Sequence, residues 1–529
     1  MDPPTTNDVP RKRRRGRRED GTGPAQSSKP ASIPNKTIAM APQKTPPKSK
    51  GRKRPKDLPK KGEEGYLSPT QLRNRRKRKK QKRDKEDAGA GAGAAEGGDG
   101  AAAVITSYCG SNTVAVAAAS ASITTTAAKK KKNKKKKHAK GSNPDQKYIR
   151  APLKCPTVVA AQQHFSSLSL PYPITLGPLT RWRNISKLPC HSVNGGVKFG
   201  LFAPGTHDVT VRSSQSPAHH VKINEGVLEL ERLCEECGVK PFQESSGEGE
   251  LKFVIINVDR AAKKAQMTLV LNLTKDEELP TSLVELTKKL KGWESLSSLF
   301  LHYNKVWKHS NAIFNFDADS WNHLHGPQAI VETLAVDGLP YSVNLRFPPN
   351  VFRQANGAAF TKIIERVRTL MPEGGDGNVN VVELYGGVGT IGLHVLDMCK
   401  SLISSDENPN NVKAFEDAVK ELPKKFRRKP SYKQLSAESM VKEGYLDGGA
   451  KVDVVIIDPP RKGCDDVVVN AINNSKAKSL IYVSCGFEAF VRDQKRLEDE
   501  GKWKLKVAEG FVLFPGADAI ETLAVFERS

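Results

Sequence analysis

From residue 379 to the C-terminus, short runs of aliphatic and β-branched residues alternate with segments of helical period. Four of these runs end in polar or reactive residues: VNVVELY (379–385), LISSDE (402–407), VVIIDPP (454–460) and SLIYVSC (479–485). Strands that alternate with helices predict an α/β domain with a doubly wound, mainly parallel sheet. In such sheets ligands bind beyond the carboxyl ends of the strands. The residues that close the runs should therefore meet at one rim.

The segments between these runs predict the helices and the end of the sheet. Helices are expected at 390–399, 408–422 and 487–501, where apolar residues recur at helical spacing. The last two runs, 503–515 and 520–528, are expected to form an antiparallel pair at the edge of the sheet.

Charge divides the chain into two unequal parts. Residues 1–150 hold 39 Lys and Arg against 13 Asp and Glu, whereas the remaining 379 residues hold 46 and 45. Three basic clusters, at 11–18, 73–83 and 129–137, alternate with Pro-rich and Gly/Ala-rich stretches. A segment so charged and so poor in apolar residues cannot repay the entropy of folding, so we predict a disordered basic tail over 1–146.

Basic clusters of this kind serve as nuclear import signals or as phosphate-binding arms. The tail therefore predicts a nuclear or nucleolar location, with the cytoplasm as the alternative. The start of the chain lacks the pattern of a secretory or transit peptide. No run of about 18 apolar residues occurs, so no membrane span is expected.

Between the tail and the α/β domain, short strand-like runs mix with two helical patterns, at 223–238 and 279–293. This mixture predicts an α+β domain over 147–345, followed by the α/β domain over 346–529. The pair Cys234 and Cys237 closes the first helical pattern without a second pair at metal-ligand spacing. We interpret it as helix-end packing, and expect no metal site.

The Gly-rich segment ELYGGVGTIG (383–392) is the first motif that indicates a ligand-binding site. Glycines there permit a sharp turn and close approach of the backbone to a ligand. Many nucleotide-binding folds share this pattern, but Glu383 before the glycines and Asp406 after the next strand favour S-adenosylmethionine. A carboxylate at such a position can accept both ribose hydroxyls. No P-loop sequence occurs.

The second motif is Asp458-Pro-Pro-Arg-Lys-Gly463, which follows a buried apolar run. Two prolines stiffen the turn and remove amide donors. Such a turn could be an ordinary Asp-Pro turn, but the Lys-Gly continuation favours a ligand-binding role for Asp458.

Cys485 and Glu521 form the third feature. Most cysteines after apolar runs are small core residues, but a thiol at a strand end that faces a ligand can act as a nucleophile. Uracil carbon 5 becomes nucleophilic once a thiolate adds to carbon 6, and a base must then remove the carbon-5 proton. Glu521 lies in an apolar terminal strand, where a carboxylate is costly unless it is paired or serves as such a base.

In their order along the chain, these motifs resemble the RNA uracil-5-methyltransferases, the family of the bacterial tRNA and 23S rRNA 5-methyluridine enzymes. The resemblance covers roughly 175–529 and includes RWRNISK (181–187), GLFAPGTHDV (200–209), INEGV (223–227) and FRQANGAAF (352–360). It implies a Rossmann-like class I methyltransferase that uses S-adenosylmethionine and acts on RNA, either tRNA or rRNA.

The resemblance also implies roles for individual residues. Gln354, Tyr385, Asp406 and Asp458 match cofactor ligands, and Phe352 matches a residue that lies against the target base. Cys485 matches the nucleophile, and Glu521 matches the base.

Some positions depart from the family's pattern. Ser-Cys-Asn-Pro reads Ser-Cys-Gly486-Phe487, and Phe-Pro-His-Thr reads Phe-Pro-Gly516-Ala517, while Ala519 replaces a common His. Ser216 stands where the last cysteine of an iron–sulfur cluster would be, so no cluster is expected. The N-terminal OB-like module of many bacterial members is missing, and the basic tail could replace its electrostatic role.

Two other functions fit parts of the pattern. An RNA cytosine-5-methyltransferase typically carries a Pro-Cys step at the fourth-strand turn, where this chain has Pro459-Pro460-Arg461 and places Cys464 beyond it. A catalytically silent RNA-binding factor, for example in ribosome assembly, would also suit the basic tail and the altered Ser-Cys-Gly-Phe sequence. The oligomeric state and the identity of the RNA stay open.

Overall fold

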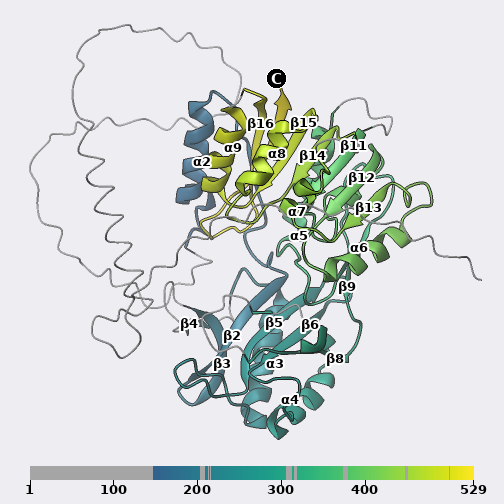
Figure 1. Cartoon of the computed structure of the whole chain (residues 1–529). Coiled ribbons are helices and arrows are strands. Elements are labelled where there is room, and N and C mark those ends of the chain that lie inside the picture. The colour runs from purple at the N-terminus through teal and green to yellow at the C-terminus, as the bar shows by residue number, and fades with distance from the viewer. Residues whose placement is uncertain are drawn as a thin grey trace, which may run out of the picture. The chain divides into compact units, whose positions relative to one another are not determined.

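The computed structural model describes residues 147–202, 209–212, 214, 216–305, 313–314, 318–372, 379–446, 451–499 and 501–529 (Figure 1). The chain divides into two units, Met1–Ala128 and Lys129–Ser529, and all structural statements below concern the second. The predicted disordered tail over 1–146 lies outside the described residues.

The C-terminal part contains an eight-stranded sheet of order β1-β16-β17-β15-β14-β11-β12-β13. Five consecutive strands of this order run parallel: β11 (Val379–Leu384), β12 (Cys399–Ser405), β13 (Pro430–Lys433), β14 (Val454–Ile457) and β15 (Ser479–Ser484). The predicted doubly wound, mainly parallel α/β fold is confirmed.

The last two strands do pair in antiparallel fashion, but the prediction that they form an edge is wrong. β17 (Glu521–Arg528) is antiparallel to both β15 and β16 (Trp503–Val512) and lies between them. β16 in turn pairs in parallel with β1 (Ile174–Leu176), which forms the edge. A strand roughly 300 residues earlier in the chain thus covers β16, and no local sequence pattern could indicate this pairing.

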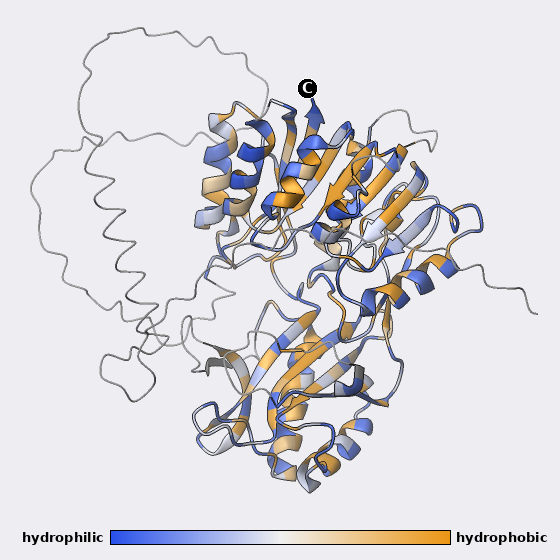
Figure 2. Ribbon diagram, viewed as in Figure 1, coloured by the Kyte–Doolittle hydropathy of each residue, from blue (hydrophilic) through white to orange (hydrophobic). Residues whose placement is uncertain are grey.

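Helices cover both faces of this sheet, and side chains of alternating strand residues enter two separate cores. Val381, Ile456 and Val483 face one core, which holds α5 (Gly357–Leu370) and α6 (Asn410–Glu421). Val382, Ile457 and Tyr482 face the other core. That core is covered by α2 (Pro156–Ser167), α7 (Ala437–Lys442), α8 (Asp466–Asn474) and α9 (Phe487–Glu498). Figure 2 shows the apolar strands between helices whose outer faces are hydrophilic.

The expected helices at 408–422 and 487–501 are confirmed as α6 and α9. The expected helix at 390–399 is wrong, because only the short 3-10 turn η5 (Gly392–His394) forms there. The Glu383 carboxylate accepts a hydrogen bond from the Gly392 amide at 2.8 Å and fixes the backbone in this turn. β12 already begins at Cys399, so the last residue of the expected helix belongs to a strand.

Residues 185–325 form a second sheet, of order β4-β3-β2-β5-β6-β7-β8. Its strands are β2 (Ile185–Val193), β3 (Gly196–Phe202), β4 (Val209–Arg212), β5 (Leu251–Asp259), β6 (Lys264–Leu271), β7 (Leu296–Tyr303) and β8 (Trp321–His325). All neighbours are antiparallel except β6 and β7, which are parallel and joined by α4 (Thr281–Lys291). α3 (Val221–Cys237) supplies Leu230 and Cys234 to the core of this layer, so the Cys234–Cys237 pair does close a packed helix.

The two ends of segment 147–345 pack with the C-terminal sheet instead of the second sheet. α2 joins its core, where the Phe165 ring stacks on the Tyr172 ring at 4.3 Å. β9 (Ile330–Thr333) and β10 (Asn344–Phe347) form a two-stranded sheet whose apolar residues join the core around α5. Two short 3-10 turns also occur, η2 (Pro152–Lys154) before α2 and η4 (Ala318–Ser320) before β8 of the second sheet.

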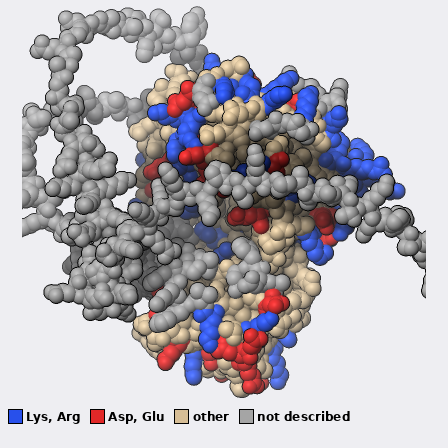
Figure 3. Space-filling model, viewed as in Figure 1, with Lys and Arg blue, Asp and Glu red and all other residues tan. Residues whose placement is uncertain are grey.

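Surface charge in this part of the chain is mixed. Figure 3 shows basic and acidic side chains interspersed on the visible face of the described residues, in keeping with the near-neutral balance of residues 151–529. None of the helices in the described ranges combines the length and hydropathy that a bilayer crossing requires.

Candidate active site

The polar residues that follow the apolar runs do lie together at the rim formed by the carboxyl ends of the parallel strands in the eight-stranded sheet. Leu384 pairs with Ile457 across β11 and β14, so Tyr385 and Asp458 leave the sheet side by side. Ser484 pairs with Thr522 across β15 and β17. Cys485 directly follows β15 and Glu521 opens β17, so this register sets the thiol-bearing residue beside the carboxyl-bearing one.

The Gly-rich loop after β11 has a backbone that only glycine accommodates without strain. Gly387 and Gly389 have φ angles of 57° and 78°. A Cβ on Gly386 would lie 2.3 Å from the Ser404 hydroxyl, and one on Gly389 would lie 2.6 Å from the Phe415 ring. The space beside Gly387 is open instead. The loop therefore offers a cradle where a ligand can approach the main chain closely.

Asp406 and Glu383, the two carboxylates expected near this loop, occupy different places. Asp406 is partly exposed, and it accepts hydrogen bonds from the Gly387 amide at 3.3 Å and the Asn408 amide at 2.9 Å. Glu383 is buried beneath the loop, where it accepts from the Gly392 amide and from the Ser404 hydroxyl at 2.5 Å. Burial raises the pKa of Glu383 to about 7. Glu383 shapes the loop, and Asp406 is the carboxylate that can face a ribose.

Tyr385 reaches the rim with its backbone, in a left-handed conformation with φ of 59°. Its side chain packs against the core that α9 covers. Burial is the main cause that raises the pKa of its hydroxyl, and the charge of the Cys464 thiolate raises it further. The structure thus places Tyr385 between the Gly-rich loop and the turn after β14, with its main chain at the rim.

Asp458, Cys485 and Glu521 form an electrostatically coupled group. Burial raises the pKa of Glu521 to about 8 and that of Asp458 to about 7, and the negative charge of Asp458 contributes to the first shift. Burial also raises the pKa of the Cys485 thiol to about 12, reinforced by Glu521 and Asp458. The positive charge of Arg461 lowers the pKa of both Cys485 and Glu521. The Cys485 sulfur lies 3.9 Å from the Pro459 carbonyl oxygen, within the Asp-Pro-Pro turn.

The turn that carries Asp458 and Arg461 is held against α9. The buried Asp493 carboxylate accepts hydrogen bonds from the Cys464 amide at 2.7 Å and the Tyr482 hydroxyl at 3.0 Å. Arg492 donates to the Lys462 carbonyl at 2.8 Å and to Asp493 at 2.7 Å. Sequence reasoning missed Asp493. A carboxylate on the apolar face of a helix, between Phe490 and Leu497, was the available signal.

Two departures from the family pattern have a local physical reason. A Cβ on Gly486 would lie 2.3 Å from the Arg461 carbonyl oxygen, so the close approach of this turn to the start of α9 requires glycine. Phe487 packs edge-on against His164 at 5.8 Å and Phe165 at 6.1 Å of α2. Phe487 thus belongs to the packing of an N-terminal helix on α9.

The segment 513–520, which leads into Glu521, is fastened by the residues before β1. Tyr148 donates its amide to the Gly516 carbonyl at 3.0 Å, and Thr157 donates its amide to the Asp518 carboxylate at 2.9 Å. Gly516 has a φ of 101°, which favours glycine at this departure from the family pattern. The Tyr172 hydroxyl bonds to that of Thr522, one residue beyond Glu521, at 2.9 Å.

Phe352 and Gln354 lie in the loop before α5. The Phe352 side chain is 68% exposed, which is unusual for a large apolar residue, and Gln354 is partly exposed. Asn356, the N-cap of α5, donates to the Leu513 carbonyl at 2.7 Å and so ties this loop to the segment that leads to Glu521. The GLFAPGTHDV sequence lies partly outside the described residues, since 203–208 are not described.

Among the described residues, no group of three or more His, Cys, Asp or Glu side chains is arranged to hold a metal ion.

No family model matches the chain. Two of the most similar curated relatives are named uncharacterized RNA methyltransferases. One, from Protochlamydia amoebophila, is 33% identical over 354 residues, which cover 66% of this chain and 87% of the relative. The other, from Bacillus cereus, is 25% identical over 370 residues, which cover 69% and 75%. Among solved structures, the Pyrococcus abyssi tRNA (uracil-54, C5)-methyltransferase in complex with S-adenosyl-L-homocysteine matches with a TM-score of 0.52 and 19% identity. That match covers 69% of this chain and 81% of the other.

The fold is therefore that of the class I S-adenosylmethionine-dependent methyltransferases. The chain belongs to the family of RNA methyltransferases that its relatives represent. The Pyrococcus structure holds S-adenosyl-L-homocysteine, and in this chain the open cradle at Gly387 beside Asp406 fits a nucleoside with a ribose diol.

Proposed function

We propose that this protein methylates carbon 5 of uridine in structured RNA, either tRNA or rRNA, through a covalent bond to Cys485. The observation that carries the proposal is the placement of Cys485 beside Glu521 at the ends of two neighbouring strands, with Asp458 on the same rim. A nucleophile and a base must both reach one pyrimidine ring, and adjacent strand ends supply that proximity.

The proposed reaction balances with these two side chains. The Cys485 thiolate adds to uracil carbon 6, and the electrons of the 5,6 double bond move onto the ring carbonyl as an enolate. Bound S-adenosylmethionine would supply its sulfonium methyl group to carbon 5, with S-adenosylhomocysteine as the neutral thioether leaving group. The Glu521 carboxylate then removes the carbon-5 proton, the double bond returns, and the sulfur leaves as thiolate.

The electrostatics of the site assign further tasks to its residues. The thiol pKa of about 12 means that Cys485 needs positive charge nearby in order to react, and Arg461 of the Asp-Pro-Pro-Arg turn lowers that pKa. Because its pKa is about 8, the Glu521 carboxylate is basic enough to keep, near neutral pH, the proton that it takes from carbon 5. Gln354, Tyr385, Asp406 and Asp458 are proposed as cofactor ligands, and Phe352 as the surface for the target base.

RNA that contains 5-fluorouridine tests the proposal, because fluorine at carbon 5 cannot be removed as a proton. We expect wild-type protein with S-adenosylmethionine to form a denaturation-resistant complex with such RNA, and Cys485→Ala to form none. Cys237→Ala is the matched control, since Cys237 lies at the end of α3 in the second sheet. With ordinary uridine RNA, Glu521→Gln should accumulate the complex that wild type resolves. Absence of an adduct on both total tRNA and total rRNA would overturn the proposal.

The cytosine alternative has less support. Cys464, the cysteine that follows the fourth-strand turn in the sequence, is buried, and burial raises the pKa of its thiol to about 12. Its amide is bound to Asp493, inside the turn instead of at its surface. Mapping 5-methyluridine and 5-methylcytidine in RNA from cells with and without the gene separates the two products. A catalytically silent factor would change neither.

A further inference from the structure

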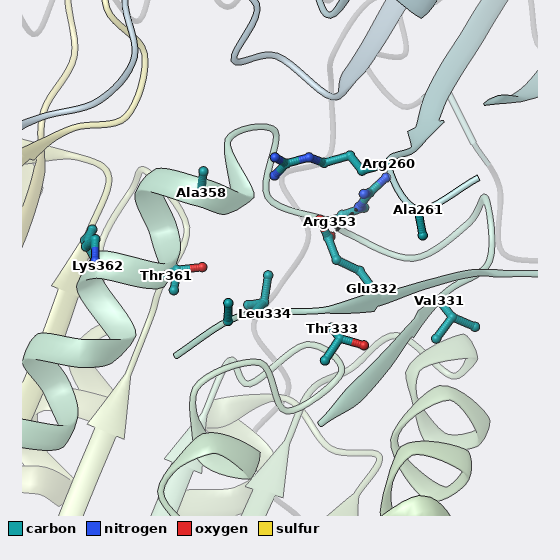
Figure 4. A pocket seen from close by; sticks show the side chains of 11 residues that line it. Arg260, Ala261, Val331, Glu332, Thr333, Leu334, Arg353, Ala358, Thr361 and Lys362 are labelled. Carbon is teal, nitrogen blue, oxygen red and sulfur yellow. Dashed lines mark hydrogen bonds and ion pairs between the residues drawn. The ribbon is translucent and has the colours of Figure 1, made fainter. Parts of the chain in front are cut away.

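A cavity of about 540 Å³ lies where the turn between β5 and β6 meets β9 and the start of α5 (Figure 4). Its charged wall consists of Arg260, Glu332, Arg353 and Lys362. None of these residues has a role in the chemistry proposed above. The cavity therefore calls for an explanation of its own.

Arg353 carries an unused hydrogen-bonding group in this wall. The residue is only 4% exposed, its Nε donates to the Glu332 carboxylate at 2.8 Å, and its Nη1 donates to the Val258 carbonyl at 2.8 Å. Its Nη2 is buried and has no hydrogen-bond partner among the described residues. A buried guanidinium donor left unpaired is costly, and such groups usually satisfy a ligand or an ordered water.

The charge of the wall favours an anion. Glu332 is already engaged by Arg353, so it offsets that guanidinium. Arg260, in the turn between β5 and β6, is exposed and adds a second guanidinium. Lys362 of α5 also lines the cavity, but its ammonium group is paired with the Glu365 carboxylate at 2.7 Å, so the free positive charge comes from Arg260. Figure 4 shows the Arg260 side chain extending towards the start of α5, with Arg353 between Arg260 and Glu332. Two guanidinium groups with donors in a planar fork suit the oxygens of a phosphate.

The position of the cavity relates it to the RNA. Arg353 lies between Phe352 and Gln354, in the loop that Asn356 ties to the Leu513 carbonyl near Glu521. Asn184, which follows the RWR sequence, donates its amide to the Ala355 carbonyl of the same loop at 2.7 Å. An anion bound by Arg353 and Arg260 is thus held by the loop that presents Phe352 to the target base.

We propose that the Arg260–Arg353 cavity binds a backbone phosphate of the substrate RNA beside the target nucleotide. This inference deepens the proposed function and rests on it for the presence of RNA at the rim of the sheet. The phosphate contact would fix the distance between the RNA backbone and Phe352, independently of base sequence.

Salt dependence of RNA binding by the full chain tests the proposal. We expect Arg260→Gln to weaken binding of transcripts of different sequence by a similar factor. We also expect it to reduce the slope of log K against log salt by about 0.7–0.9, the value for one phosphate contact. Arg260→Lys keeps the charge and should retain the slope while its affinity falls in part. Arg428→Gln is the matched control. Arg428 is an exposed residue between α6 and β13, at the edge of the parallel sheet opposite the rim.

Equal slopes for wild type and Arg260→Gln would overturn the proposal. So would an equal reduction of slope in Arg260→Gln and Arg428→Gln, because the effect would then be general electrostatics. The 5-fluorouridine adduct, formed at low salt with saturating RNA, reports on the uridine chemistry separately. A reduced slope for Arg260→Gln without any adduct would support the phosphate site and contradict the uridine assignment. An adduct together with an unchanged slope would support the uridine assignment and contradict the phosphate site.

Discussion

Glu521 combines a buried position with a proposed chemical task. It is 6% exposed, and its pKa of about 8 shows that the folded protein favours its neutral form near neutral pH. A catalytic base has to be ionised in order to act. Methyl transfer at subsaturating RNA should therefore increase as pH rises towards 8.

The same pKa makes Glu521 a cost to stability at alkaline pH. Because the folded state binds this proton more tightly than the unfolded state, with its ordinary pKa of 4.5, stability falls as pH rises from about 4.5 to 8. Glu521→Gln removes this effect. The variant should melt several degrees above wild type at pH 8.5, with a difference that shrinks towards pH 5.

Thermal unfolding of both proteins across this pH range measures the effect. Glu527→Gln, an exposed residue of the same strand, is the control and should show no pH-dependent difference. A Glu521→Gln melting difference that does not grow with pH would contradict the assignment of a raised pKa.

At the scale of elements, α9 acts as a brace for the turn after β14. Asp493 connects the Cys464 amide, the Tyr482 hydroxyl and Arg492 in one buried network. Gly463 and Gly486 let the two segments approach each other, because a Cβ on either would overlap its neighbour. This packing holds the turn against α9, so we expect Asp493 to position Asp458 and Arg461 relative to Cys485.

Asp493→Asn should loosen this turn while the fold persists. We expect a destabilisation of about 1–3 kcal/mol, typical of the removal of a charged hydrogen bond. The rate of adduct formation should fall at least tenfold well below the melting temperature, with little change in RNA affinity. Asp466→Asn alters a 91%-exposed partner of Arg496 and should leave the rate near wild type. A rate that falls only in proportion to the unfolded fraction would reduce Asp493 to a purely structural residue.

At the scale of the whole molecule, the described part of the chain begins beside the segment that leads to the rim. The first described residues bind the segment that leads to Glu521, through the Tyr148 amide and the Gly516 carbonyl. Tyr148 follows Lys137, the last residue of the third basic cluster, by eleven positions. The covalent chain therefore allows at most about 40 Å between that cluster and this segment, a distance over which it could contact bound RNA.

Deletion of residues 1–146 tests that contribution. RNA affinity should fall, because Lys and Arg release counterions from the RNA, and its salt dependence should flatten by about 0.7–0.9 for each phosphate that the tail neutralises. Adduct formation at low salt and saturating RNA should persist, since Cys485 and Glu521 remain. An unchanged slope would leave the tail a role in localisation alone, and the nuclear or nucleolar location itself stays a prediction.

The sequence by itself determined six of the eight strands of the C-terminal sheet, the Gly-rich turn and the order of Asp458, Cys485 and Glu521, because these depend on local patterns and on the rule that the carboxyl ends of parallel strands lie together. Only the tertiary structure decided which strands are neighbours, that β1 and α2 cover the C-terminal sheet, and that 390–399 forms no helix. It also decided that Glu383 shapes the loop from below, that Asp493 braces the turn, and that Arg353 leaves a donor unpaired in a cavity. Each of these depends on contacts between residues far apart in the chain. Such contacts are decided by how side chains pack and pair their hydrogen-bonding groups in three dimensions, and local periodicity does not encode that.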